Sequence, residues 1–155
     1  MKFLIDSREQ APFAFDGYEV WLETAALPCG DYSLPGFTDK AAVERKSLDD
    51  LIGCLMGKER ERFEKELAKA KHYELFGVVV EGTLADVCQG KYRSAMRPHS
   101  ALQSIIAWQV RYRVPFLFAG SRKMAEYWVY CTLAKYLREI EERFKTATKA
   151  QEKAA

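Results

Sequence analysis

The sequence has no long apolar run and no beginning typical of a secreted protein. Within its 155 residues no apolar stretch reaches about eighteen residues, the length that a membrane-spanning helix requires. The opening MKFLIDSRE reaches acidic residues too early for a secretory signal peptide. These absences predict a cytoplasmic protein that does not associate with a membrane.

Cysteine and histidine are scarce, and their spacing matches no metal site. No two of the four cysteines form a C-x-x-C pair, and neither His72 nor His99 stands at zinc-ligand spacing from any of them. We therefore expect reduced, mostly buried thiols. The cysteines are Cys29, Cys54, Cys88 and Cys131.

Charge is unevenly distributed along the chain, although the formal net charge is only +2. Residues 1–57 contain five Lys or Arg and ten Asp or Glu, a balance of −5. Residues 58–155 contain nineteen and twelve, a balance of +7. This asymmetry is compatible with a metal site next to a bound polyanion. The solvated faces of helices are the simpler explanation of charge alone.

The order of the expected elements predicts one α/β domain. We expect strands at 2–6, 18–22, 31–34, 41–45, 76–82 and 114–120, and helices after Ser47 and at 58–73, 100–113 and 121–145. The first strands are expected to form an antiparallel meander. The later alternation of helix and strand predicts a three-layer fold with a central mixed sheet flanked by helices. We expect the domain to cover 1–145, and 146–155 to be a disordered tail.

Two carboxylates are expected to face each other across a hairpin. If 31–34 pairs with 41–45 around the Pro-Gly turn, a symmetric register sets Asp31 opposite Glu44. Directly opposed side chains have Cβ atoms about 4.5–5.5 Å apart, so two carboxylates there repel each other. A divalent cation between them removes the repulsion, and oxygen ligands suit Mg²⁺.

The residues after Glu44 extend this candidate site. Side chains alternate along a strand, so Glu44 and Lys46 share a face while Arg45 points away. The carboxylate is suited to hold a metal, and the lysine to orient a water or contact a phosphate. As a bare pattern, Asp followed later by Glu-x-Lys is equally typical of a solvated hairpin.

Three further acids lie near these residues in the sequence. Asp6 and Glu9 follow the first strand, where by themselves they would serve only to cap a turn. Asp50 stands three residues after Ser47 in an S-x-x-D capping-box variant, and it is also able to support Lys46 or Arg45.

Taken together, these motifs resemble the nuclease domain of the XPF-type structure-specific endonucleases. In order, the chain carries I-D-x-R-E, G-D-Y and V-E-R-K-S-x-x-D, then RFEKEL, an apolar strand ending in E-G, P-H-S-A-L-Q-S-I and VPFLFAG. The resemblance extends over nearly the whole chain. G-D followed by E-R-K-x-x-x-D is a far more specific signal than the acidic pattern alone.

The resemblance implies a three-layer restriction-endonuclease-like α/β fold. It also implies Mg²⁺-dependent or Mn²⁺-dependent cleavage of branched, flap or forked DNA, as in repair, recombination and replication. One or two metal ions are compatible with the acids present. The implied catalytic residues are Asp31, Glu44, Lys46, Arg45, Asp6, Glu9 and Asp50, of which Asp31, Glu44 and Asp6 are the implied metal ligands.

Family members commonly carry helix-hairpin-helix modules after the nuclease domain, and this chain has no room for them. We expect a stand-alone nuclease domain that grips DNA through its own basic residues, a dimer partner or an accessory DNA-binding protein. Basic residues interleaved with Tyr92 suit phosphates and an unstacked base, although 91–100 is equally typical of an ordinary surface loop. The candidate DNA-binding residues are Arg8, Lys58, Lys91, Arg93 and Arg97.

The aromatic residues of 121–145 favour a homodimer through the C-terminal helices, although a helix that merely covers the sheet uses similar residues. Three other functions stay open. A catalytically silent DNA-binding or dimerisation partner of another nuclease would be expected to have lost the acids that this chain retains. A nuclease of RNA or of single strands is not distinguished, because phosphate contacts carry little information about the sugar. The combined motif disfavours an unrelated α/β protein with surface charges.

Overall fold

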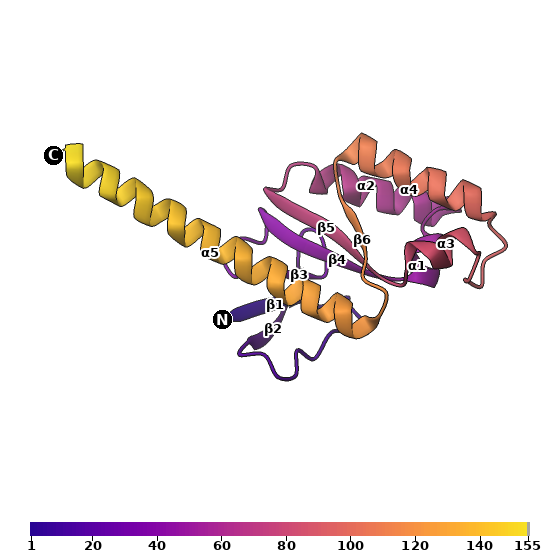
Figure 1. The fold of residues 1–155 in the computed structure, drawn as a ribbon, viewed down its shortest axis with the longest axis horizontal. Helices are drawn as coiled ribbons and strands as arrows, with labels where there is room; N and C mark the ends of the chain where they lie inside the picture. The colour runs from indigo at the N-terminus through magenta and orange to yellow at the C-terminus, as the bar shows by residue number, and fades with distance from the viewer. Residues whose placement is uncertain (155) are drawn as a thin grey trace.

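A single mixed sheet forms the centre of the fold, and the computed structural model describes residues 1–154 (Figure 1). The strands stand in the order β2-β1-β3-β4-β5-β6. Pairing is antiparallel for β1 with β3 and for β3 with β4, and parallel for the other neighbours. The strands are β1 (Lys2–Asp6), β2 (Trp21–Ala25), β3 (Tyr32–Ser33), β4 (Ala41–Ser47), β5 (Leu75–Glu81) and β6 (Phe116–Phe118).

Helices cover both faces of the sheet, which confirms the expected three-layer α/β fold (Figure 1). The helices are α1 (Leu48–Gly53), α2 (Gly57–Ala70), α3 (Leu84–Cys88), α4 (Pro98–Tyr112) and α5 (Arg122–Ala154). Helices α1, α2 and α4 share one hydrophobic core with the sheet, and α5 shares the other. Helix α3 is not among the expected elements.

Strand β5 shows how the sheet is buried between these layers. Val78 and Val80 belong to the core under α1, α2 and α4, whereas Val79 between them belongs to the core under α5. All three side chains are fully buried. An apolar run without alternation is what a strand covered on both faces requires, so this part of the sequence-based prediction is confirmed.

The prediction for the second strand is wrong. The strand begins at Trp21 and pairs in parallel with β1, so β1 and β2 do not form an antiparallel meander. The chain turns just before and at the start of the expected strand: Phe15 has a φ of 55° and its carbonyl accepts a hydrogen bond from the amide of Tyr18. The amide of Val20 then donates to the Tyr18 carbonyl over 2.9 Å, which is not strand pairing. The Tyr18 ring then packs against Tyr130 of α5, with ring centroids 4.3 Å apart.

Helix α5 runs on where a disordered tail is expected. It continues past 145 to Ala154, and its last turns project beyond the sheet (Figure 1). This stretch is rich in Ala, Lys and Glu, which are strong helix formers. Residues 141–153 are exposed, so the division into a domain and a tail stays a prediction. Residue 155 lies outside the described residues.

The four thiols are free, and Cys29 alone among them is buried, while Cys88 is exposed. The expectation of mostly buried thiols is therefore wrong. Within residues 1–154 no helix has the length and apolar character needed to cross a membrane.

Candidate active site

The β3–β4 pair brings the two principal carboxylates together. Tyr32 pairs with Val43 and Ser33 with Ala42, so one further step in this register sets Asp31 opposite Glu44. The backbone N–H of Arg45 donates to Oδ2 of Asp31 over 2.8 Å, which ties the carboxylate to the neighbouring strand. The predicted register is confirmed.

Lys46 and Arg45 point to opposite faces of β4, as alternation predicts. Nζ of Lys46 lies 2.5 Å from Oε1 of Glu44 and 4.7 Å from the centroid of the ring of Phe63 in α2. Nε of Arg45 instead donates to Oε1 of Glu81 over 2.7 Å on the α5 side. Glu44 and Lys46 therefore form one site, and Arg45 supports it from behind.

Burial and mutual repulsion disfavour the ionised forms of the two acids. Burial raises the pKa of Asp31 to about 7, against the opposing effect of the Arg45 N–H. Burial also raises the pKa of Glu44 well above its ordinary value, and the nearby charge of Asp31 adds to that shift. Glu44 is only 4% exposed. Such a pair is stabilised by a proton or by a cation.

Lys46 supplies one positive charge to this pair. Burial acts to lower the pKa of its ammonium, but the charge and hydrogen bond of Glu44 together with nearby Cys54 and Asp31 outweigh burial, and the pKa lies above its ordinary value. Lys46 is therefore a permanent cation at neutral pH. A single ammonium leaves the two carboxylates with an excess negative charge when both are ionised.

Asp6 lies close to the site but its oxygens already have donors. Its carboxylate accepts hydrogen bonds from the backbone N–H, Nε and NH2 of Arg8 and from the N–H of Leu27. Burial acts to raise the pKa of Asp6, but the bonds from Arg8 and Leu27 lower it overall. Within residues 1–154 no three Asp, Glu, His or Cys side chains are grouped so as to hold a metal ion. The role of Asp6 as a ligand stays a prediction.

Glu66 is a further acid of the site that the sequence-based analysis did not assign. Its Oε1 accepts a hydrogen bond from the N–H of Gly30 over 3.1 Å, directly before Asp31. Its charge also contributes to the raised pKa of both Asp31 and Glu44. Glu66 is part of the RFEKEL motif in α2. Because charged residues occupy most faces of this helix, the sequence does not reveal which glutamate points toward the site.

Asp50 acts on the helix cap and makes no ion pair with Lys46 or Arg45 among the described residues. Its Oδ2 accepts from the Ser47 hydroxyl over 2.6 Å, and its N–H donates to that hydroxyl oxygen over 3.1 Å. The predicted N-cap at Ser47 is confirmed, and support of Lys46 by Asp50 stays a prediction.

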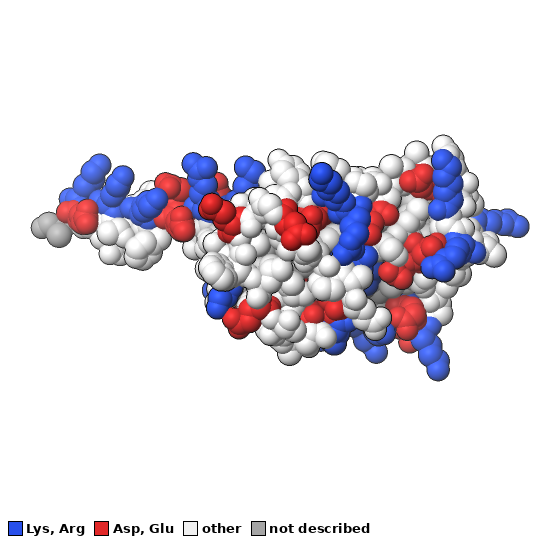
Figure 2. Space-filling view, turned by 90° about the horizontal axis from the view of Figure 1, so that it is seen from below, with Lys and Arg blue, Asp and Glu red and all other residues white. Residues whose placement is uncertain are grey.

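The candidate DNA-binding residues differ in whether an acidic side chain already engages them. Arg93 is held by Asp49, with Nε 2.8 Å from Oδ2, and Lys91 lies 3.7 Å from Asp86. Arg8 is engaged by Asp6, while Lys58 and Arg97 are exposed. Figure 2 shows basic and acidic side chains interspersed on the face that it presents.

A cavity of about 460 Å³ adjoins the site at the end of β4. Ser47, the residue that follows Lys46 in the sequence, forms part of its wall. Its lining residues are Ser47, Leu48, Asp49, Glu81, Lys91, Tyr92 and Arg93. The loop that begins at Lys91 is thereby placed next to the end of β4.

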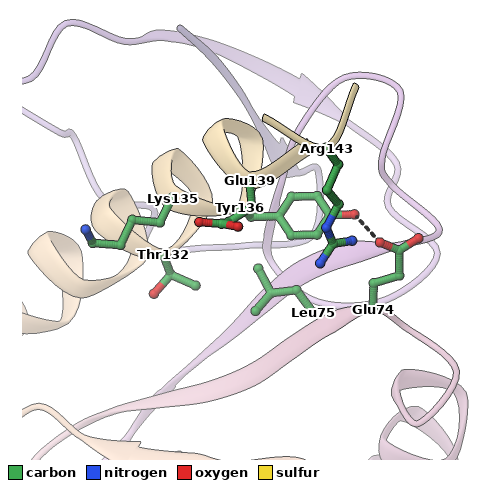
Figure 3. A pocket seen from close by; sticks show the side chains of 7 residues that line it. All are labelled: Glu74, Leu75, Thr132, Lys135, Tyr136, Glu139 and Arg143. Atoms are coloured by element: carbon green, nitrogen blue, oxygen red, sulfur yellow. Dashed lines mark hydrogen bonds between the residues drawn. The ribbon is translucent and has the colours of Figure 1, made fainter. Parts of the chain in front are cut away.

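A second cavity, of about 580 Å³, lies at the other end of the sheet (Figure 3). Leu75 at the start of β5 and Tyr136 of α5 line it, and the Tyr136 hydroxyl donates to Oε2 of Glu74 over 3.1 Å. Because β4 and β5 are parallel, this end is opposite to that of Lys46. None of the predicted site residues lines this cavity.

Comparisons with known proteins identify a family and similar solved structures for this chain. The family model described as the ERCC4 domain matches residues 5–132. The structure of XPF from Aeropyrum pernix is similar with a TM-score of 0.71 and 21% identity, over 94% of this chain and 69% of that chain. XPF from Aeropyrum pernix in complex with DNA gives a TM-score of 0.67 and 25% identity, over 89% of this chain and 65% of that chain.

The chain thus spans about two thirds of the length of these XPF chains. A search of curated proteins found no match. The structural similarity confirms the restriction-endonuclease-like fold that the motifs implied. Because the family model matches most of its residues, the chain belongs to the ERCC4 domain family.

Proposed function

We propose that this chain is a divalent-metal-dependent endonuclease that hydrolyses phosphodiester bonds in branched, flap or forked DNA. The observation that supports this most strongly is the opposed Asp31–Glu44 pair with the Lys46 ammonium 2.5 Å from Glu44. An acid pair and a lysine at the end of paired strands provide the groups that phosphodiester hydrolysis requires.

The donor set fits a hard divalent cation such as Mg²⁺ or Mn²⁺. Asp31 and Glu44 offer carboxylate oxygens, and their raised pKa values reflect an unfavourable negative charge that a cation relieves. Asp6 is a further ligand if Arg8 releases it. When bound, such an ion neutralises charge on the phosphate and lowers the pKa of a bound water.

The chain's own residues have separate tasks in this proposal. Lys46 contacts a non-bridging phosphate oxygen or orients the attacking water, because its ammonium stays charged beside Glu44. The N–H of Arg45 fixes the direction of the Asp31 carboxylate. Glu66 fixes the turn before Asp31 through the N–H of Gly30.

DNA is the proposed substrate because a structural relative has been solved in complex with DNA. The cavity between Ser47 and Arg93 lies within reach of a strand that crosses Lys46. Lys91 and Arg93 are placed to contact phosphates there if they exchange their acidic partners for the phosphates, and Arg8, Lys58 and Arg97 extend the contact. The cytoplasmic location expected from the sequence stays a prediction.

A homodimer through α5 and an accessory DNA-binding protein are proposed as partners. Tyr127 and Phe144 of α5 are 49% and 73% exposed, which leaves apolar surface for a second chain. Tyr130 and Tyr136 instead pack against Tyr18 and Phe37 of the same chain. Light scattering after size exclusion distinguishes a dimer of about twice 17.8 kDa from a monomer.

The test of the proposed function is cleavage of labelled flap, fork, Holliday-junction and plain duplex DNA in Mg²⁺ and in Mn²⁺. We expect cutting that EDTA abolishes and that favours branched substrates. Glu44→Gln should lose it, whereas Glu141→Gln on the exposed end of α5 should cut like the wild type. DNA binding without any cutting by the wild type would favour a catalytically silent partner of another nuclease.

A further inference from the structure

Four charged side chains, Glu9, Arg45, Glu81 and Arg122, form a connected chain on the face of the sheet opposite Lys46. Oε1 of Glu81 accepts hydrogen bonds from Nε of Arg45 over 2.7 Å and from NH1 of Arg122 over 2.8 Å. NH1 of Arg45 also lies 3.5 Å from Oε1 of Glu9. The Arg45, Glu9 and Glu81 side chains are at most 13% exposed. Arg122 has no role in the site as described so far.

Arg122 joins α5 to the segment that follows β1. Its NH2 group donates to the carbonyl oxygens of Ala11 and Pro12, each over 2.8 Å. Its guanidinium carbon lies 4.7 Å from the centroid of the Phe13 ring. One planar guanidinium thereby binds a carboxylate, two carbonyls and an aromatic face, which is a set of contacts suited to arginine.

Arg45 transmits this restraint to the other face of the sheet. It stands between Glu44 and Lys46 in β4, and its N–H holds the Asp31 carboxylate over 2.8 Å. Glu81 pairs with Ser47 at the end of the parallel β4–β5 ladder. A displacement of the Arg45 side chain would therefore shift the backbone that carries Glu44 and Lys46.

We propose that Arg122 is a positioning residue, which clamps Glu81 and residues 9–13 against Arg45 and so fixes Glu44 and Lys46 on the opposite face. The effect on cleavage rests on the proposed nuclease function. The clamp itself is a property of the folded chain and is measurable without DNA.

Three variants separate the clamp from the loss of charge. Arg122→Ala removes all four contacts. Arg122→Lys keeps the charge, but a single ammonium does not reproduce the forked set of hydrogen bonds. Lys123→Ala removes one positive charge from the next residue of the same helix and is the matched control, since Lys123 is exposed.

The first measurement is amide hydrogen exchange of the chain without metal or DNA. The informative amides are that of Arg45, which donates to Asp31, and that of Phe13, which donates to the Tyr32 hydroxyl over 2.8 Å. We expect exchange about tenfold faster in Arg122→Ala, an intermediate effect in Arg122→Lys and none in Lys123→Ala. Equal exchange in Arg122→Ala and the wild type would overturn the proposal.

The second measurement is single-turnover cleavage with DNA in excess of its half-saturation concentration. We expect Arg122→Ala to cut about 10- to 100-fold more slowly with unchanged DNA half-saturation, because a displaced catalytic group slows the step after binding. Wild-type cleavage rates in Arg122→Ala would overturn the proposal. So would weaker DNA binding with an unchanged saturated rate, since Arg122 would then be a DNA contact.

The two measurements test the clamp and the proposed function separately. If the wild type does not cleave DNA, the proposed function is wrong, and the exchange rates alone decide whether the clamp exists. If Arg122→Ala does not fold, Arg122→Lys gives the same comparison with a smaller expected effect.

Discussion

Asp31 and Glu44 couple their protonation to folding. Asp31 has a pKa of about 7 in the fold against an ordinary value of 3.8. Between these two pH values the folded chain binds a proton that the unfolded chain has released, so the free energy of unfolding falls as pH rises. Glu44, whose pKa is also raised, acts in the same direction. Bound cations compete with this proton.

Asp31→Asn is expected to stabilise the metal-free protein at pH 8. The amide keeps an oxygen for the Arg45 N–H and removes the buried charge. We expect the free energy of unfolding in EDTA to rise on the order of 2 kcal/mol at pH 8, with the difference shrinking toward pH 4. Urea unfolding measures it, with the exposed Asp16→Asn as control. A wild type that gains stability steadily from pH 4 to pH 8 would contradict this account.

At the scale of elements, the β3–β4 hairpin was predictable because local rules fix it. Pairing around a Pro-Gly turn sets the register, and the register sets Asp31 against Glu44. Alternation then assigns Glu44 and Lys46 to one face. The inward turn of Glu66 and the bonds of Glu81 were not predictable, because they depend on how α2 and α5 pack on the sheet.

Strand β2 escaped prediction for a related reason. Its partner is β1, and the parallel pairing depends on a crossover through 7–20 rather than on a local turn. Trp21 is 77% exposed at the sheet edge, and no residue of β2 is buried. The strand therefore lacks the alternation of apolar and polar residues that marks a half-buried strand. Tyr18 and Val20, which favoured the expected strand, lie in the turn before it.

The turn before Asp31 requires glycine, which gives a prediction at this scale. Gly30 has a φ of +76°, and a Cβ there would lie 2.9 Å from the Cβ of Ala42. Gly30→Ala should therefore lower the free energy of unfolding by about 2 kcal/mol or more and also misplace Asp31.

The matched control for Gly30→Ala is Gly53→Ala at the end of α1. A Cβ at Gly53 meets nothing within 4 Å, and its φ is not positive. That variant should unfold at or slightly above the wild-type urea concentration. Equal unfolding curves for the two variants would show that the Gly30 turn is not restrained as described.

On the scale of the whole molecule, the end of α5 contributes little to the core. Its buried side chains are Ala125, Val129 and Leu133, and every residue from 141 to 153 is exposed. A chain truncated after residue 145 should therefore unfold within about 2 °C of the full chain, as measured by circular dichroism. A drop of 10 °C or more would show that the domain includes the projecting helix.

The central claim is that Asp31 and Glu44 act as one unit in phosphodiester hydrolysis. The most direct test is the single-turnover cleavage rate of one branched DNA in Mn²⁺ for Asp31→Asn, Glu44→Gln and the double variant. We predict that each single variant loses about 1,000-fold or more, and that the double variant loses no more than the worse single one. Losses that multiply, or a single variant that cuts like the wild type, would contradict the claim.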